Sequence, residues 1–263
     1  MMRKSIQDTK IVFVGAGNLA TNLAKALYHK GFLITQVYSR TAANARILAN
    51  TVEAEWTDSI DDINNEGEIY FVCLTDTALV EMLPQIVKNK EHALFLHTAG
   101  SVSIDIWKGL VDRYGVVYPM QTFSKQVEVD FSEIPIFIET NNEEDHQLVK
   151  AIASTLSKKI YDTTSKQRKV LHLAAVFTCN FTNHMYAIAA DLLSRYDLSF
   201  DVMLPLVDET ARKVHQLPPI DTQTGPAIRS DKNVINDHLD MLSGDPEMKE
   251  LYELISKSIH NLK

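Results

Sequence analysis

Cysteine is scarce in this chain. Only Cys73 and Cys179 occur among 263 residues, far apart and without C-x-x-C spacing. This pattern offers neither a disulfide framework nor a zinc site, so we predict reduced thiols and no bound metal. Apolar runs as long as a membrane span are also lacking. Residues 1–8 contain no hydrophobic core of a signal peptide, and we therefore expect a cytoplasmic protein.

Clustered positive charge is equally scarce. The net charge is −8 and the pI is about 5.6, whereas a surface that binds nucleic acid needs gathered Lys and Arg. The basic cluster at residues 166–169 is short, and we interpret it as a solvated helix face. We expect a small-molecule substrate as the partner, with no nucleic acid and no membrane.

A glycine-rich turn follows the first predicted strand. Residues 11–14 have the composition of a buried strand, and residues 18–29 have helical periodicity. Between them Gly15 permits a tight turn and Gly17 lets the backbone approach a pyrophosphate, in a G-x-G-x-x-A spacing. The pyrophosphate would lie over the first helical N–H groups, at Asn18 and Leu19. A tight turn without a ligand is the alternative.

Acidic residues are absent between Gly15 and Glu53, where a protein that binds NAD usually places one for the ribose 2′-hydroxyl. The predicted strand at residues 33–38 ends instead in Ser39, Arg40 and Thr41. Two hydroxyls and a guanidinium suit a 2′-phosphate. We therefore predict NADP (NADPH) as the cofactor, the alternative being a solvent-exposed arginine.

Strands and helices alternate over about the first 160 residues, which predicts a parallel, doubly wound sheet. The strand that begins at Ile69 ends at Leu74, Thr75 and Asp76, and such carboxyl ends line the ligand crevice. Asp76 also has the character of an N-cap. Pro135 interrupts the last apolar run and places it towards a sheet edge.

The pattern then becomes helical. Residues 164–196 contain no Gly or Pro, and the run at residues 171–177 is apolar nearly all round, which predicts burial between domains or subunits. We place a domain boundary near Thr163, with an all-helical second domain. On the first long helix, His172, Val176, Cys179 and Asn183 form one stripe, and Asn180 lies about 80° round from His172.

Further candidates lie close to the ends of other predicted elements. Thr224 belongs to a Thr-Gly-Pro turn, and Arg229 can bind a carboxylate in a bidentate manner. The alternative there is a helix start capped by Asp231. We predict a substrate site that includes His97, Gln121, Thr224 and Arg229. For His172, a satisfied core histidine is the alternative to catalysis.

These motifs resemble one family. It joins a Rossmann-like domain to a helical domain of unknown function 2520 (DUF2520), within the NADP oxidoreductase (coenzyme F420-dependent) and pyrroline-5-carboxylate-reductase-like superfamily. The carriers are residues 15–20, 39–41, 97–101, 118–123, 172–180 and 224–231. The resemblance implies an NADP-binding Rossmann domain at residues 1–162 and a helical domain for substrate binding and dimerisation at residues 163–263. It also implies a homodimer and catalytic roles for His172 and Asn180.

The chain departs from relatives at three points. Related β-hydroxyacid dehydrogenases have a Lys with an Asn four residues later, where this chain has His172 and Val176. Tyr118 replaces the family's usual His, and Ala99 replaces a Ser. The chemistry of those dehydrogenases is therefore not carried over to this chain. From the motifs and the resemblance together we expect an NADP(H)-dependent oxidoreductase acting on a small anionic C=O or C=N compound. The alternatives are a non-catalytic NADP(H) sensor, a methyltransferase, or coenzyme F420 as the hydride partner.

Overall fold

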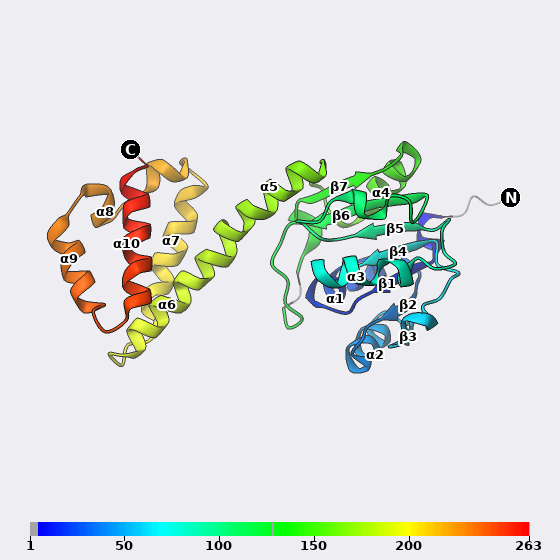
Figure 1. Ribbon diagram of the computed structural model, residues 1–263, viewed down its shortest axis with the longest axis horizontal. Coiled ribbons are helices and arrows are strands. Elements are labelled where there is room, and N and C mark those ends of the chain that lie inside the picture. The colour runs from blue at the N-terminus through cyan, green and yellow to red at the C-terminus, as the bar shows by residue number, and fades with distance from the viewer. Residues whose placement is uncertain (1–4, 128, 263) are drawn as a thin grey trace. The chain divides into compact units, whose positions relative to one another are not determined.

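The structure, a computed structural model, describes residues 5–127 and 129–262. Residues 1–4, part of the segment in which we expect no signal peptide, lie outside this range. The first half alternates strands and helices (Figure 1). Its strands are β1 (Ile11–Val14), β2 (Ile34–Tyr38), β3 (Glu55–Thr57), β4 (Ile69–Val72), β5 (Leu94–His97), β6 (Arg113–Pro119), β7 (Ile136–Thr140) and β8 (Ile160–Asp162). Its helices are α1 (Asn18–His29), α2 (Ala42–Thr51), α3 (Asp76–Ile86) and α4 (Glu143–Leu156).

These strands form one sheet in the order β3-β2-β1-β4-β5-β6-β7-β8. All neighbours are parallel except β6 and β7, an antiparallel pair that the sequence analysis does not predict. The order reverses between β1 and β4, as in doubly wound sheets that bind a ligand at the reversal. β7 lies towards one edge as expected, but it pairs on both sides, because Pro135 precedes its first paired residue.

Helices cover both faces of the sheet. Ile11 and Phe13 of β1 belong to the apolar cluster that contains the buried residues of α1, α2 and α4. The alternate residues Val12 and Val14 join the cluster that contains α3. Successive side chains of a strand point to opposite faces, so a strand buried on both sides must be apolar throughout. This explains why residues 11–14 contain no polar side chain.

Contacts divide the chain into two compact units, Met1–His184 and Met185–Lys263. The boundary therefore lies about 20 residues beyond the expected one near Thr163. The reason is that α5 (Ser165–Ala175) packs onto the sheet and continues through a π turn (Val176–Phe181) into α6 (Thr182–Ser194). Figure 1 labels α5 and α6. α5 begins with a capping box, in which Thr164 Oγ1 accepts from Gln167 N and Gln167 Oε1 accepts from Thr164 N.

The second unit is helical, as predicted. Besides most of α6 it contains α7 (Leu204–Val214), α8 (Pro226–Arg229), α9 (Lys232–Met241) and α10 (Pro246–His260). Asp231 caps α9 by accepting from Val234 N, so the capping role predicted as the alternative for this residue is confirmed. None of the helices that the structure describes is long and apolar enough to cross a membrane.

The apolar run at residues 171–177 is not buried within the single chain. Leu173 is 58% exposed and Phe177 is 62% exposed. Of the two predicted modes of burial, the single chain leaves burial between subunits as the prediction that remains. Large apolar side chains that face solvent at helical spacing are typical of an interface with another molecule.

The basic cluster at residues 166–169 is also not uniformly solvated. Lys166 and Lys169 are exposed, but Arg168 is 0% exposed. Its guanidinium pairs with Glu139 of β7 and donates to the carbonyls of Ala99 (3.2 Å) and Val102 (2.6 Å). Glu139 also accepts from Ser165 N at 2.9 Å. Arg168 thereby ties α5 to the ends of β5 and β7.

Replacing Arg168 by Met should lower the free energy of unfolding by about 3–5 kcal/mol, because Glu139 keeps a largely buried charge without its counter-ion. Urea denaturation measures this loss. Lys169→Met, in the same cluster but exposed, is the matched control and should change stability by less than about 0.5 kcal/mol. Adding Glu139→Gln to Arg168→Met should recover part of the loss. Equal effects of the two single substitutions would contradict the assignment.

Candidate active site

The glycine turn between β1 and α1 has the geometry of a phosphate cradle. Gly15 has a φ of +117°, and a Cβ at this position would collide with the carbonyl oxygen of Cys73. A Cβ at Gly17 would meet nothing within 4 Å, so the backbone there is open to a ligand. Ala20 is buried where α1 meets the sheet. The small residues therefore stand where the sequence analysis expects them.

The first turn of α1 offers free N–H groups. Gly17 is its N-cap, and no side chain caps it. Asn18 and Leu19 begin the helix, so their N–H groups have no partner within it. An uncapped helix N-terminus attracts an anion through these groups and the helix dipole. These residues fit the pyrophosphate of a dinucleotide.

The end of β2 leads into a second uncapped helix. Ser39 Oγ accepts from Thr41 N at 3.3 Å, and Thr41 is the N-cap of α2 without a side-chain bond to the helix. Arg40 is exposed beside them. A guanidinium at a free helix N-terminus suits the 2′-phosphate of NADP.

The end of β4 lies beside the glycine turn. Leu74 is half-buried, and its side chain is within 3.4 Å of where a Cβ on Gly15 would stand. Thr75, not Asp76, is the N-cap of α3, and its hydroxyl accepts from Ala78 N at 3.4 Å. Asp76 is instead the first helical residue, and its carboxylate accepts from the Ser101 hydroxyl. This bond joins the carboxyl ends of β4 and β5.

His172 lies over the carboxyl ends of β5 and β6. A Cβ on Gly100 would come within 2.7 Å of His172 Nδ1, so only glycine leaves room for the ring. Tyr118 Oη, at the end of β6, lies 3.3 Å from the same Nδ1. The two rings meet edge to face, with centroids 6.2 Å apart. With Nδ1 engaged, Nε2 is the nitrogen left for a substrate.

Arg168 lies one turn before His172 on α5, a spacing that puts both residues on one face of the helix. Burial raises the pKa of the Tyr118 hydroxyl, and the charge of Arg168 opposes that rise. Tyr118 therefore stays a protonated hydroxyl, able both to donate and to accept a hydrogen bond. Neither Arg168 nor Tyr118 is among the site residues predicted from the sequence. The four-residue spacing from Arg168 to His172 is the signal that could have found the first.

The π turn changes which side chains share the face of His172. A π turn takes up one residue more than an α-helical turn, so later residues are displaced by about 100°. Asn180, near the end of the turn, moves from about 80° towards the face of His172. Asn183 moves away from that face by the same displacement. The predicted stripe that ends at Asn183 is therefore wrong, while the turn favours Asn180.

His97 does not face a ligand. Its side chain is 0% exposed, its Nδ1 accepts from Ala99 N at 3.2 Å, and its ring stacks near Trp107. Burial and the nearby charge of Arg168 lower the pKa of His97 to about 3. The neutral ring is buried inside the protein at the end of β5 and has a packing role there. The structure thus contradicts direct substrate contact by His97.

The remaining predicted substrate residues belong to different units of the chain. Gln121 is exposed after β6, where its Oε1 accepts from Thr122 N at 2.9 Å. Thr224 and Arg229 belong to the second unit, where both are exposed. Thr224 borders an apolar hollow of about 280 Å³ between α6, α8 and α10. Their substrate roles stay predictions.

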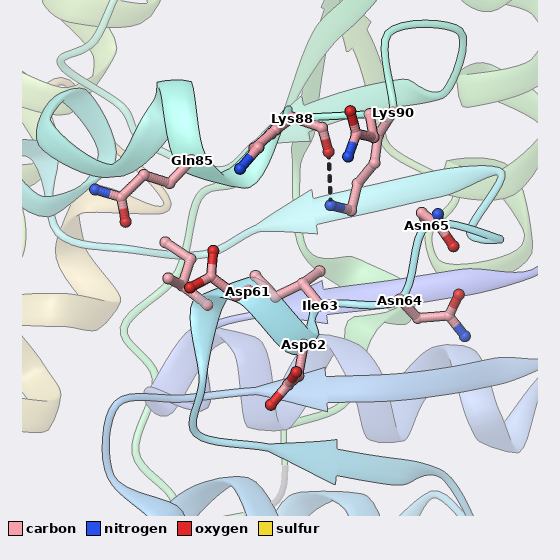
Figure 2. A pocket seen from close by; sticks show the side chains of 10 residues that line it. Asp61, Asp62, Ile63, Asn64, Asn65, Gln85, Lys88 and Lys90 are labelled. Atoms are coloured by element: carbon pink, nitrogen blue, oxygen red, sulfur yellow. Dashed lines mark hydrogen bonds between the residues drawn. The ribbon is translucent and has the colours of Figure 1, made fainter.

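A larger, polar hollow of about 640 Å³ lies at the amino-terminal ends of the strands, next to the segments that lead into β4 and β5. Figure 2 shows Lys90 there, with its Nζ directed at the Lys88 carbonyl 3.0 Å away. Asp61 and Asp62 border the same hollow. Because it lies away from the glycine turn, it is separate from the candidate active site. Within the described part of the chain, no group of three His, Cys, Asp or Glu side chains could hold a metal.

Comparison with known proteins agrees with this geometry. Residues 10–99 match the family described as NADP oxidoreductase coenzyme F420-dependent. Residues 134–259 match the domain of unknown function DUF2520. A solved structure from Bacteroides fragilis, named as a candidate NADP oxidoreductase, is 64% identical. The match covers 98% of this chain and 100% of that one, with a TM-score of 0.95.

Two more distant proteins are similar in part. A reductive aminase from Aspergillus terreus, solved with NADPH and ethyl-5-oxohexanoate, has a TM-score of 0.70 at 17% identity, over 97% of this chain and 98% of that one. A glutamyl-tRNA reductase from Listeria welshimeri is 26% identical over 167 residues. That match covers 59% of this chain, and the chain spans only 34% of that relative's length.

The chain therefore belongs to the family of NADP oxidoreductases in which a nucleotide-binding domain is joined to a DUF2520 domain. It is an NADP-dependent oxidoreductase, and NADP(H) is its cofactor. The expected resemblance and fold class are confirmed.

The buried His97 predicts a pH-dependent stability. Its pKa is about 3 in the folded chain and near 6.5 when unfolded. Between these values only the unfolded chain binds the proton, so this residue removes stability as the pH falls below 6.5. The loss approaches about 1.4 kcal/mol per pH unit. Urea unfolding of the wild type and of His97→Gln from pH 7 to 5 measures the difference. Parallel pH profiles would contradict this assignment.

Proposed function

We propose that the chain reduces or oxidises a small, anionic C=O or C=N compound with NADP(H), and that His172 exchanges the proton. The observation that carries this proposal is the His172–Tyr118 pair over Gly100, at the same strand ends as the glycine turn. The reductive aminase with bound NADPH has a similar fold and supports the choice of a C=O or C=N bond. The anionic character of the substrate rests on Arg229 in the sequence.

The bound cofactor supplies or accepts a hydride. In the reducing direction, protonated His172 gives the Nε2 proton to the oxygen or nitrogen of the substrate. The Tyr118 hydroxyl accepts from Nδ1–H in both states of the ring, so it holds the ring in place while the proton leaves. Asn180, turned towards the same face by the π turn, orients the substrate. Arg229 or Gln121 holds its polar end.

The test has two parts. Calorimetric titration with NADPH, NADH and coenzyme F420 should give NADPH as the tightest ligand. Turnover is then followed by the loss of NADPH absorbance with a panel of small carbonyl and imine carboxylates. His172→Gln should lower turnover by roughly 10²–10⁴-fold and leave the NADPH dissociation constant unchanged, because it removes only the proton donor. Tyr118→Phe should lower turnover less and shift its pH profile.

His184→Gln is the matched control, since this exposed histidine lies on the same helical run. Its turnover should equal that of the wild type. If His172→Gln is as active as the wild type, the proton-exchange role is wrong. Tight binding of NADPH without turnover of any substrate would favour the sensor instead. Preference for coenzyme F420 over NADPH would replace the proposed hydride partner.

We infer as well that two copies associate through the helical second half, which we assign to substrate binding and dimerisation. In the described part of the second unit, Ala227 and Leu242 are the only buried residues. Its many exposed apolar side chains include Val202, Leu204, Leu206 and Leu254. A unit of this kind has almost no interior of its own, and a second copy can cover these faces.

The two cysteines are unpaired, which supports the proposed cytoplasmic location.

Sedimentation velocity should therefore show a particle of two 29.6-kDa chains. Leu206, 63% exposed on α7, is the substitution site. Leu206→Glu should dissociate the dimer, because a charge would be buried in an apolar contact. Asp201→Lys, an exposed polar change just before α7, should not. A monomeric wild type would refute the dimer.

A further inference from the structure

The loop between β6 and β7 lies on the side of the sheet where the carboxyl ends of β1 and β2 form the candidate nucleotide site. It begins after Pro119, beside Gln121, and is held on the first turns of α1 by Asn22. The Asn22 amide is buried and donates both to Asn18 O (2.9 Å) and to Ser124 O (3.0 Å). Phe123 stacks on Phe131 with centroids 5.7 Å apart and packs against the apolar core. Together these contacts hold the backbone of Phe123 and Ser124, and so they determine where Lys125, the residue after Ser124, is placed.

Lys125 reaches the start of α2. Its Nζ donates to Asn44 Oδ1 at 3.0 Å. Asn44 lies in the first turn of α2, three residues after Thr41. The β6–β7 loop thus brings a second cation, Lys125, to the start of α2, where Arg40 already stands.

The charge of Lys125 is available to a ligand. The lysine is exposed, and the acceptor on Asn44 is a neutral amide. Among the residues that the structure describes, Lys125 forms no ion pair with a carboxylate. Burial raises the pKa of the Tyr38 hydroxyl at the end of β2, and the charge of Arg40 opposes that rise. A dianionic phosphate at the start of α2 gains from a cation additional to Arg40.

We propose that Lys125 is a second cation of the 2′-phosphate site and determines the preference for NADPH over NADH. The ligand is the phosphate monoester on the adenosine ribose, which Arg40 binds from the β2 side and Lys125 from the β6–β7 loop. The ammonium exchanges its bond to Asn44 for one to a phosphate oxygen. This inference rests on the cofactor of the proposed function.

Calorimetric titration of the full chain tests the role. Lys125→Met should weaken NADPH binding roughly tenfold, the usual order for a charge-assisted hydrogen bond. NADH binding should be unchanged, because NADH lacks the 2′-phosphate. Adenosine 2′,5′-bisphosphate should lose affinity as NADPH does, and adenosine 5′-monophosphate should not. Lys125→Arg should keep most of the preference, since it keeps the charge.

Lys108→Met is the matched control, because Lys108 is exposed outside the candidate nucleotide site. It should bind both cofactors as the wild type does. If the wild type prefers NADPH but Lys125→Met keeps that preference, or loses NADH affinity equally, the inference is wrong and the proposed function stands. If the wild type binds neither cofactor, the proposed function fails as well. Unchanged thermal unfolding of Lys125→Met would show that it remains folded.

Discussion

The buried pair between Arg168 and Glu139 is the constraint on which the site depends. A guanidinium with no access to solvent must have its donors satisfied, and here a carboxylate, two carbonyls and a hydroxyl do so. These acceptors lie on β7, after β5 and on α5 itself, so the pair determines where α5 meets the sheet. His172 follows one turn later, and its place over Gly100 is a consequence of that docking.

Electrostatics divides the strand ends into two regions. Near β1 and β2, helix N-termini without side-chain caps leave N–H groups for the phosphates of the cofactor. Near β5 and β6 the polar groups are neutral or paired: His97 is buried, Tyr118 beside His172 is protonated, and the charge of Arg168 is compensated by Glu139. The first region suits the negatively charged phosphates of the cofactor, and the second holds the ring of His172, with its proton, in a fixed position.

Much of the first region could be predicted from the sequence, because its signals are local. The glycines, the small residue at Ala20 and the Ser-Arg-Thr junction each follow from a turn or a helix start, and they appear where expected. The second region depends on contacts between distant residues. Nothing in a short basic run separates Arg168 from its lysine neighbours, since only Glu139, 29 residues away, decides which one is buried. His97 was misassigned for the same reason, because burial at a strand end is a tertiary property.

The π turn has a consequence for the comparison of sequences. It takes in one residue without breaking the helix, so positions before and after it no longer correspond to those of a relative with a continuous α-helix. An alignment without a gap would pair each residue after the turn with a neighbour that faces elsewhere. Transfer of residue roles from a relative with a continuous α-helix therefore holds up to Ala175 and must be shifted by one position beyond Phe181. Against such a relative, homologous position and equivalent position in space differ within a single helix.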